Sequence, residues 1–108
     1  MEAGGYFSDQ AVTLPVGPVS AARQRLMDVT RECLAAAVAQ AVPGNRVSDV
    51  SRAVYELATS HGYGVVRDYC GHGTGFASHE DPQVPNYVGA GPNPRLKEGM
   101  VLAIEPMV

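Results

Sequence analysis

Glu105 is the residue whose position most needs an explanation, because it directly follows the apolar run Val101–Ile104. A carboxylate buried in such a run would lose its hydration at a cost of several kcal/mol unless it were paired, protonated or bound to a metal ion. In the alternative interpretation, Glu105 ends a strand and points to water or meets an arginine. If the carboxylate is buried, the sequence predicts a partner of positive charge for it.

Two histidines in a glycine-rich stretch could supply further ligands to such an ion. His72 stands between Gly71 and Gly73, so the backbone can turn sharply and present the imidazole free of neighbouring bulk. By itself this pattern is more typical of a histidine in a surface turn than of a metal ligand. His79 is followed by two carboxylates, which in the simpler interpretation only raise its affinity for a proton.

Asp9 is uninformative alone, since aspartates near turns are ordinary. On a strand, however, its side chain would share a face with Ala11 and Thr13, which are small enough to leave room for an ion. Carboxylate and imidazole ligands together favour divalent manganese, iron, cobalt or zinc over magnesium or calcium.

The sequence around these residues resembles a known family. It reads Tyr69-Cys70-Gly71-His72-Gly73-Thr74-Gly75 and continues as His79-Glu80-Asp81-Pro82-Gln83-Val84-Pro85-Asn86-Tyr87. Ser8-Asp9-Gln10-Ala11 precedes it, and Gly99-Met100 and Ile104-Glu105-Pro106-Met107-Val108 follow. The blocks and the spacing between Asp9, His72 and Glu105 resemble the type I methionine aminopeptidases over nearly the whole chain.

The resemblance implies a two-metal site with two aspartates, one histidine and two glutamates as ligands. Asp9, His72 and Glu105 match three of them, and in the family the aspartate at the position of Asp9 bridges both ions. The other aspartate would precede Met1 and the other glutamate would follow Val108. We therefore expect at most one divalent ion here, manganese, iron, cobalt or zinc.

The resemblance also implies catalytic roles. His79 is expected to bind the substrate, to hydrogen-bond the scissile peptide and to stabilise the charge that develops on it. Glu105 is expected to be both a ligand and the base that transfers the proton. The substrate would be the N-terminus of a peptide or nascent protein, from which the initiator methionine is removed.

Two positions depart from the family pattern. Thr74 stands where an aliphatic residue is more common, and Ser78 stands where a bulky residue helps to wall the methionine pocket, a role that Phe76 could take in part. Two alternatives stay open: a non-catalytic module of the same fold that binds peptide or protein, and a related peptidase specific for Xaa-Pro bonds.

The fold that the resemblance implies is an α+β, partial pita-bread fold, with an antiparallel sheet and two packed helices. Residues 1–108 would form a single incomplete catalytic-domain fragment, the end of the first pseudo-repeat and most of the second. Hydrophobic periodicity and breakers predict the elements in this order: a strand Tyr6–Val16, a helix from Ser20 to Pro43, a helix capped by Ser48 and ended by Gly62, a strand Tyr63–Tyr69, an extended loop with four prolines, and a strand Met100–Met107.

Both predicted helices carry an apolar stripe. In the first it consists of Leu26, Val29, Cys33, Ala37, Val38 and Ala41, and in the second of Val50, Ala53, Val54, Leu57 and Ala58. His61 would compensate the dipole at the end of the second helix and take no part in catalysis. The C-terminal strand is apolar on both faces apart from Glu105, which is typical of a covered strand.

Composition narrows the class of protein. With 108 residues, 45% of them hydrophobic, and a net charge of −3, the chain is expected to be one small globular domain. Its eight lysines and arginines are scattered, which argues against a nucleic-acid partner, and no apolar segment is long enough to span a membrane. Cys33 and Cys70 fit free thiols in a cytoplasmic protein. A strand edge exposed at Val108 predicts possible self-association.

Overall fold

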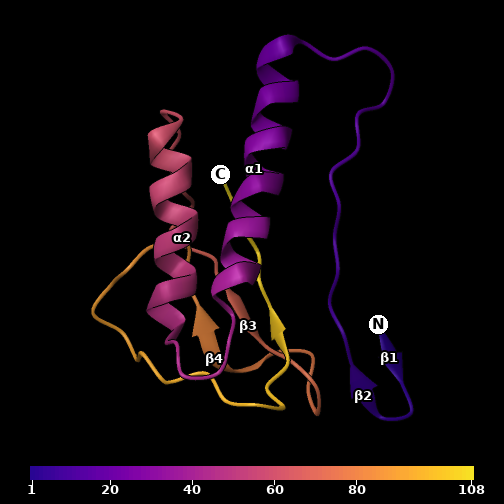
Figure 1. Cartoon of the computed structure of the whole chain (residues 1–108). Coiled ribbons are helices and arrows are strands. Elements are labelled where there is room, and N and C mark those ends of the chain that lie inside the picture. The colour runs from indigo at the N-terminus through magenta and orange to yellow at the C-terminus, as the bar shows by residue number, and fades with distance from the viewer.

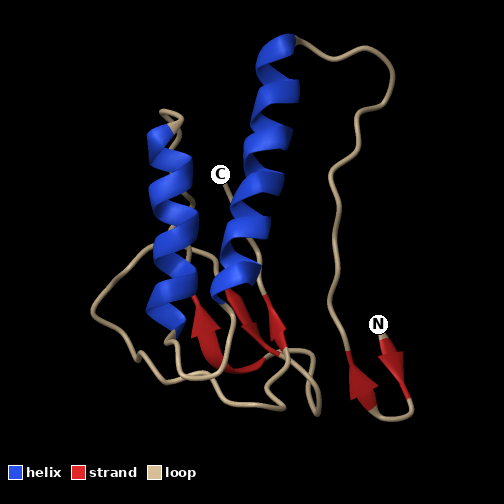
Figure 2. Ribbon diagram, viewed as in Figure 1, coloured by secondary structure: helices blue, strands red, loops and turns tan.

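The computed structural model describes all residues, 1–108, and shows two helices beside a small sheet (Figures 1 and 2). The elements are β1 (Glu2–Ala3), β2 (Tyr6–Phe7), α1 (Ala21–Gln40), α2 (Val47–Ser60), β3 (Gly71–Gly73), β4 (Glu80–Val84) and β5 (Leu102–Ala103). The predicted α+β class and the pair of packed helices are confirmed. We call residues 1–19 the arm and residues 20–108 the body.

The helices pack through the predicted stripes to form the core. Its buried residues are Val29, Cys33, Ala37, Val47, Val50, Val54, Ala58, Val84 and Leu96. The prediction that Cys33 lies in the core is confirmed. Val38 was predicted on the buried stripe, but its side chain is 54% exposed, so it lies outside the face of α1 that packs into the core.

The two helix starts differ in how well the sequence predicts them. Ser20 caps α1 as predicted, since its hydroxyl accepts a hydrogen bond from the Arg23 amide at 3.3 Å. The prediction for Ser48 is wrong, because the N-cap of α2 is Arg46, two residues earlier, and the helix begins at Val47. Arg46 donates its amide to Asp49, while Ser48 is engaged with Asn93 through two hydrogen bonds of 2.9 Å.

A three-stranded antiparallel sheet has the order β4-β3-β5, and His72 sits in its central strand opposite Gln83 and Ala103. The glycines on either side of His72 therefore serve a purpose other than the predicted turn. A Cβ at Gly71 would collide with the carbonyl of Ala103, and one at Gly73 would collide with the carbonyl of Asp81. Two neighbouring strands approach β3 so closely that only glycine fits at these positions.

The strands are much shorter than predicted. The segment Tyr63–Tyr69 forms no strand, although its Tyr63 amide donates to the carbonyl of Ala58 and its Val66 amide to that of Met107. β5 covers two residues of the predicted strand Met100–Met107, so Glu105 lies beyond its end. The predicted proline-rich loop begins instead as strand β4, which tolerates Pro82 because it lies at the edge of the sheet.

The arm differs most from its prediction. Of the strand predicted over residues 6–16, Tyr6 and Phe7 alone are paired, in a hairpin with β1. Residues 10–19, which we call the linker, run alongside the body without a backbone hydrogen bond (Figure 1). The side chains of Val12, Leu14 and Val16 are 71%, 68% and 95% exposed. Alternating apolar residues predicted a half-buried strand, but the linker has no neighbouring strand to pair with.

A candidate metal centre

His72 is held in a fixed orientation by its own strand. The side chain is buried, and its Nδ1 donates a hydrogen bond to the carbonyl of Gly73 at 2.8 Å. Because a carbonyl can only accept, Nδ1 carries a proton, and when the ring is neutral Nε2 presents a lone pair. This Nε2 is buried and has no hydrogen-bond partner.

Two carboxylates converge on that nitrogen from opposite ends of the chain. Asp9 comes from the arm and places Oδ2 3.5 Å from Nε2 of His72, and Glu105 places Oε1 3.1 Å from it. The side chains of Asp9 and Glu105 are 48% and 35% exposed, so the site is open on the carboxylate side. The backbone of Glu105 is held by the buried side chain of Asn86, whose Nδ2 donates a hydrogen bond to the Glu105 carbonyl at 3.0 Å.

These three groups fit a divalent cation. A neutral imidazole nitrogen and two carboxylates are all electron-pair donors, so at these distances they repel one another unless a positive charge lies between them. A proton on Nε2 or a metal ion can supply that charge. The oxygen and nitrogen donor set suits manganese, iron, cobalt or zinc.

His79 lies against the same site. The ring centroids of His79 and His72 are 4.1 Å apart, and Nδ1 of His79 lies 3.2 Å from the hydroxyl of Ser78. One ligand atom each from Asp9, His72 and His79 falls within 4.8 Å of the others. The sequence placed His79 on the substrate side, and its position in the structure also puts it within reach of an ion.

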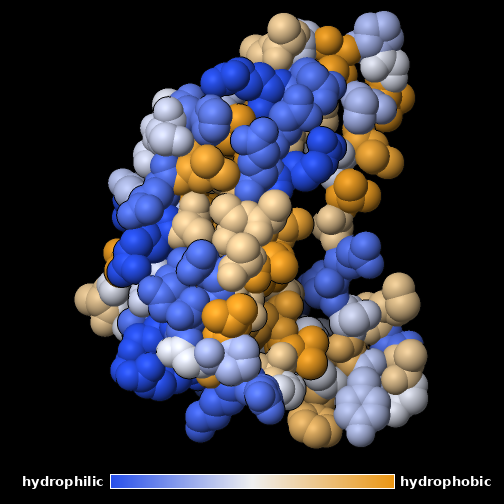
Figure 3. Space-filling view, in the orientation of Figure 1, coloured by the Kyte–Doolittle hydropathy of each residue, from blue (hydrophilic) through white to orange (hydrophobic).

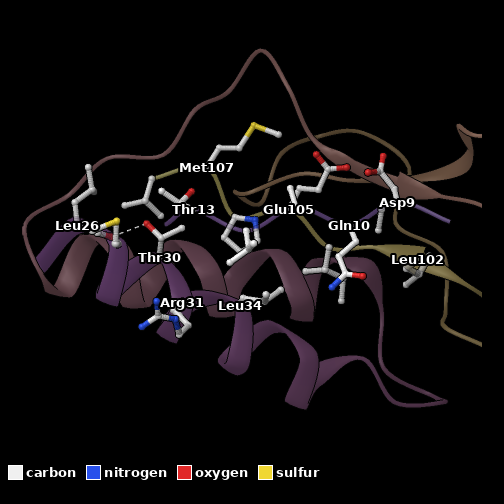
Figure 4. A pocket seen from close by; sticks show the side chains of 17 residues that line it. Asp9, Gln10, Thr13, Leu26, Thr30, Arg31, Leu34, Leu102, Glu105 and Met107 are labelled. Carbon is white, nitrogen blue, oxygen red and sulfur yellow. Dashed lines mark hydrogen bonds between the residues drawn. The ribbon is translucent and has the colours of Figure 1, made fainter. Parts of the chain in front are cut away.

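A groove of about 530 Å³ opens onto the site (Figure 4). Its walls are residues 9–13 of the arm and residues 102–108, and α1 contributes Leu26, Met27, Thr30, Arg31 and Leu34. In Figure 4 the carboxylates of Asp9 and Glu105 lie next to each other at one end, and Leu26 lies at the other. The acidic half of the site therefore borders a largely apolar channel.

Thr74, which departs from the family pattern, and Phe76 both join the arm to the body. The hydroxyl of Thr74 is part-buried and donates to the carbonyl of Phe7 at 3.3 Å, which joins the arm to the body. Phe76 is 81% exposed and its ring contacts that of Tyr6, with centroids 5.7 Å apart. Phe76 thus belongs to the contact between arm and body.

Sequence reasoning missed Asn86, which is 2% exposed and anchors the Glu105 backbone. Its place in the histidine-containing block was visible, but nothing in that block indicated a bond to a residue so far along the chain. The structural role predicted for His61 agrees with its contacts. It caps α2, accepts a hydrogen bond from Arg25 at 3.2 Å and lies 3.8 Å from Glu32.

Residues 1–108 match the model of the metallopeptidase family M24 along their whole length, so the chain belongs to this family. A methionine aminopeptidase of Treponema pallidum is 54% identical over 105 residues, which cover 96% of this chain and 41% of that protein. The crystal structure of a Thermotoga maritima methionine aminopeptidase has a TM-score of 0.90 at 47% identity, covering 95% of this chain and 41% of that one.

A second kind of M24 structure is also similar. The prolidase of Pyrococcus furiosus has a TM-score of 0.81 at 33% identity, and the match covers 95% of this chain and 30% of the prolidase. These likenesses confirm the partial pita-bread fold. The chain spans about two fifths of the length of the methionine aminopeptidases that it matches. No helix is both long and apolar enough to cross a membrane.

Proposed function

We propose that this chain holds one divalent transition-metal ion through Asp9, His72 and Glu105, and that it carries part of the active site of a methionine aminopeptidase. One observation supports this above all others. The buried Nε2 of His72 presents a lone pair, without a hydrogen-bond partner, to two carboxylates at 3.1 and 3.5 Å. Such an arrangement is stabilised by a positive charge, and in this proposal a bound divalent cation supplies it.

The substrate of this proposal is a peptide or nascent protein with an N-terminal methionine. The curated relatives with about half of their matched residues identical are named methionine aminopeptidases. A bound divalent cation would supply Lewis-acid chemistry, polarising the peptide carbonyl and making water more acidic.

The side chains around the proposed ion would transfer the proton and stabilise the developing charge. Glu105 is partly exposed, so its carboxylate can accept a proton from water and pass it to the leaving amine. His79 stands beside His72 and can donate a hydrogen bond to the peptide oxygen as negative charge develops there. The orientation of His72 is already fixed by Gly73, as metal-binding histidines commonly require.

Metal binding can be tested apart from catalysis. Isothermal titration of the purified chain with manganese or zinc should give one site per chain. The His72→Ala variant should lose it, and His61→Ala, a matched control at a histidine outside the cluster, should keep it. Equal binding by the His72→Ala variant and the original chain would exclude the proposed site.

Activity is tested with the peptide Met-Ala-Ser in the presence of manganese or cobalt. The proposal expects release of methionine that is lost in both His72→Ala and Glu105→Ala variants. Metal binding without any peptide cleavage would instead support the non-catalytic binding module.

An Xaa-Pro peptidase is the second candidate, and the likeness to the Pyrococcus furiosus prolidase supports it. The methionine aminopeptidase structure is more similar, with a TM-score of 0.90 against 0.81. A panel that pairs Met-Ala-Ser with Gly-Pro substrates separates the two. Cleavage confined to the Gly-Pro bond would overturn the methionine assignment in favour of the second candidate.

A further inference from the structure

The proposed metal site is divided between two parts of the chain. His72 and Glu105 belong to the body, whereas Asp9 is carried by the arm. The arm is attached to the body by a hydrogen bond from the Phe7 amide to the Gly75 carbonyl at 2.7 Å, by the Thr74 hydroxyl and by the ring contact of Tyr6 with Phe76. The arm therefore docks through residues 6–9.

The linker that joins this docked segment to α1 has no backbone hydrogen bonds to hold it in place. It nevertheless runs extended beside the groove. It contains no charged residue, so two linkers placed side by side would not repel each other. Figure 3 shows hydrophobic residues along the arm and along the facing side of the body. Gly17, with φ of 69°, provides a bend just before α1.

We propose that two copies of this chain exchange arms and form a dimer in which each metal site is shared. Asp9 of one copy lies against His72 and Glu105 of the other, through the contacts that residues 6–9 make within one chain. The two linkers cross near the twofold axis, and residues 10–14 pair antiparallel. The shared ligands rest on the proposed metal site, whereas the exchange of arms does not.

The balance between monomer and dimer follows from what changes on exchange. The contacts of residues 6–9 are the same in both forms, so they favour neither. The dimer loses the freedom of two separate molecules. It gains the hydrogen bonds of the paired linkers and covers Val12 and Leu14, which are 71% and 68% exposed in one copy alone. Unpaired extended edges of this kind are known sites of domain exchange.

Arm exchange can be measured without any metal. Two chains in a Cys70→Ser background, one with Tyr6→Cys and one with Phe76→Cys, are unfolded, mixed, refolded and mildly oxidised. Exchange brings the two new thiols together across chains, so disulfides between unlike chains should clearly exceed those between like chains. A random mixture of pairs, or no covalent dimer, would overturn the proposal.

Shared ligands are tested by complementation. Asp9→Ala and His72→Ala chains each lack a ligand, and neither alone should bind manganese with the affinity of the original chain. After joint refolding, half of the dimers should contain both chains, each with one intact site, so about a quarter of the original binding sites should return. No recovery despite disulfides between unlike chains would refute the shared metal site and leave the arm exchange standing.

A surface variant tests the role of the linker. The double variant Val12→Lys and Leu14→Lys should shift the protein from dimer to monomer in size-exclusion chromatography with light scattering, since four lysines would meet across the twofold axis. Val88→Lys, at a half-exposed valine of a body loop, should leave the dimer intact. A wild-type chain that stays monomeric at all concentrations, or a dimer indifferent to the linker lysines, would contradict the proposal.

Discussion

His72 and Asp9 contribute to the same site but are held in opposite ways. His72 lies in the central strand of a sheet, is 7% exposed and has its ring fixed by a backbone carbonyl. Asp9 follows a two-residue strand, its side chain is 48% exposed and it precedes a linker without hydrogen bonds. The body thus presents a preorganised half of the proposed metal site, and the arm would deliver the remaining ligand at an entropic cost.

This contrast predicts unequal losses when the ligands are removed. His72→Ala should lower manganese affinity by at least about 100-fold, because the variant loses the only nitrogen donor that the sheet of the body holds. Loss of a residue that merely hydrogen-bonds a metal ligand typically costs ~10–100-fold. Asp9→Ala should cost about 10-fold, since part of its contribution offsets the ordering of the arm. Titration calorimetry measures both, and a greater loss with Asp9→Ala would reverse the order of the two half-sites.

Replacing a glycine beside His72 should disturb the preorganised half-site itself. A Cβ at Gly71 would meet the backbone of Ala103, so Gly71→Ala should force β5 away and destabilise the fold by about 1–3 kcal/mol. Metal affinity should fall with it, because Glu105 follows β5. Gly91→Ala is the matched control, since a Cβ there meets nothing within 4 Å. Urea unfolding of both variants measures the loss of stability. Equal unfolding midpoints for Gly71→Ala and Gly91→Ala would contradict the close approach of β5 to Gly71.

The same contrast extends to stability away from the site. Val54 is 2% exposed between the helices, so Val54→Ala should cost about 1–3 kcal/mol through lost burial and an added cavity. Val12 on the linker is 71% exposed, and Val12→Ala should change the unfolding free energy by no more than about 0.5 kcal/mol. Both are measured by urea denaturation at a protein concentration where the chain is monomeric. A cost for Val12 close to that for Val54 would mean that the linker is packed in solution.

The success of sequence reasoning follows the same division. Helix α1 and the core position of Cys33 could be predicted because periodicity and the Ser20 cap are local signals. The glycines around His72 could be noticed, but their reason could not, since it lies in the carbonyls of two other strands. The start of α2 was missed because Asn93, far along the chain, engages Ser48.

The candidate site shows what spacing can and cannot reveal. The resemblance grouped Asp9, His72 and Glu105, and the structure brings these three together. The lone pair on Nε2 of His72 and the anchoring of Glu105 by Asn86 depend on backbone groups that become neighbours only after folding. The predicted strand Tyr6–Val16 failed for a related reason. Alternation indicates that a segment can pair, but it does not supply the partner.

The two cysteines extend the comparison to the reactivity of a buried and a partly exposed thiol. Burial, together with the negative charge of Glu32, raises the pKa of the Cys33 thiol above its ordinary value of 9.0, and the thiol lies 3.7 Å from the Val54 carbonyl to which it donates. Cys70 is partly exposed. Iodoacetamide at neutral pH should therefore modify Cys70 at least ~10-fold faster than Cys33, as read by mass spectrometry.

The raised pKa of Cys33 also fixes the sign of a pH effect on stability. The folded chain holds the thiol proton more tightly than the unfolded chain, so this contribution is fully present below pH 9.0 and is lost as the pH rises through the higher folded value. The unfolding free energy should accordingly decline as the pH rises above 9.0. In a Cys33→Ala variant this part of the decline should disappear, whereas Cys70→Ser should retain it. An identical pH dependence in Cys33→Ala and the original chain would show that Cys33 ionises as easily in the core as in water.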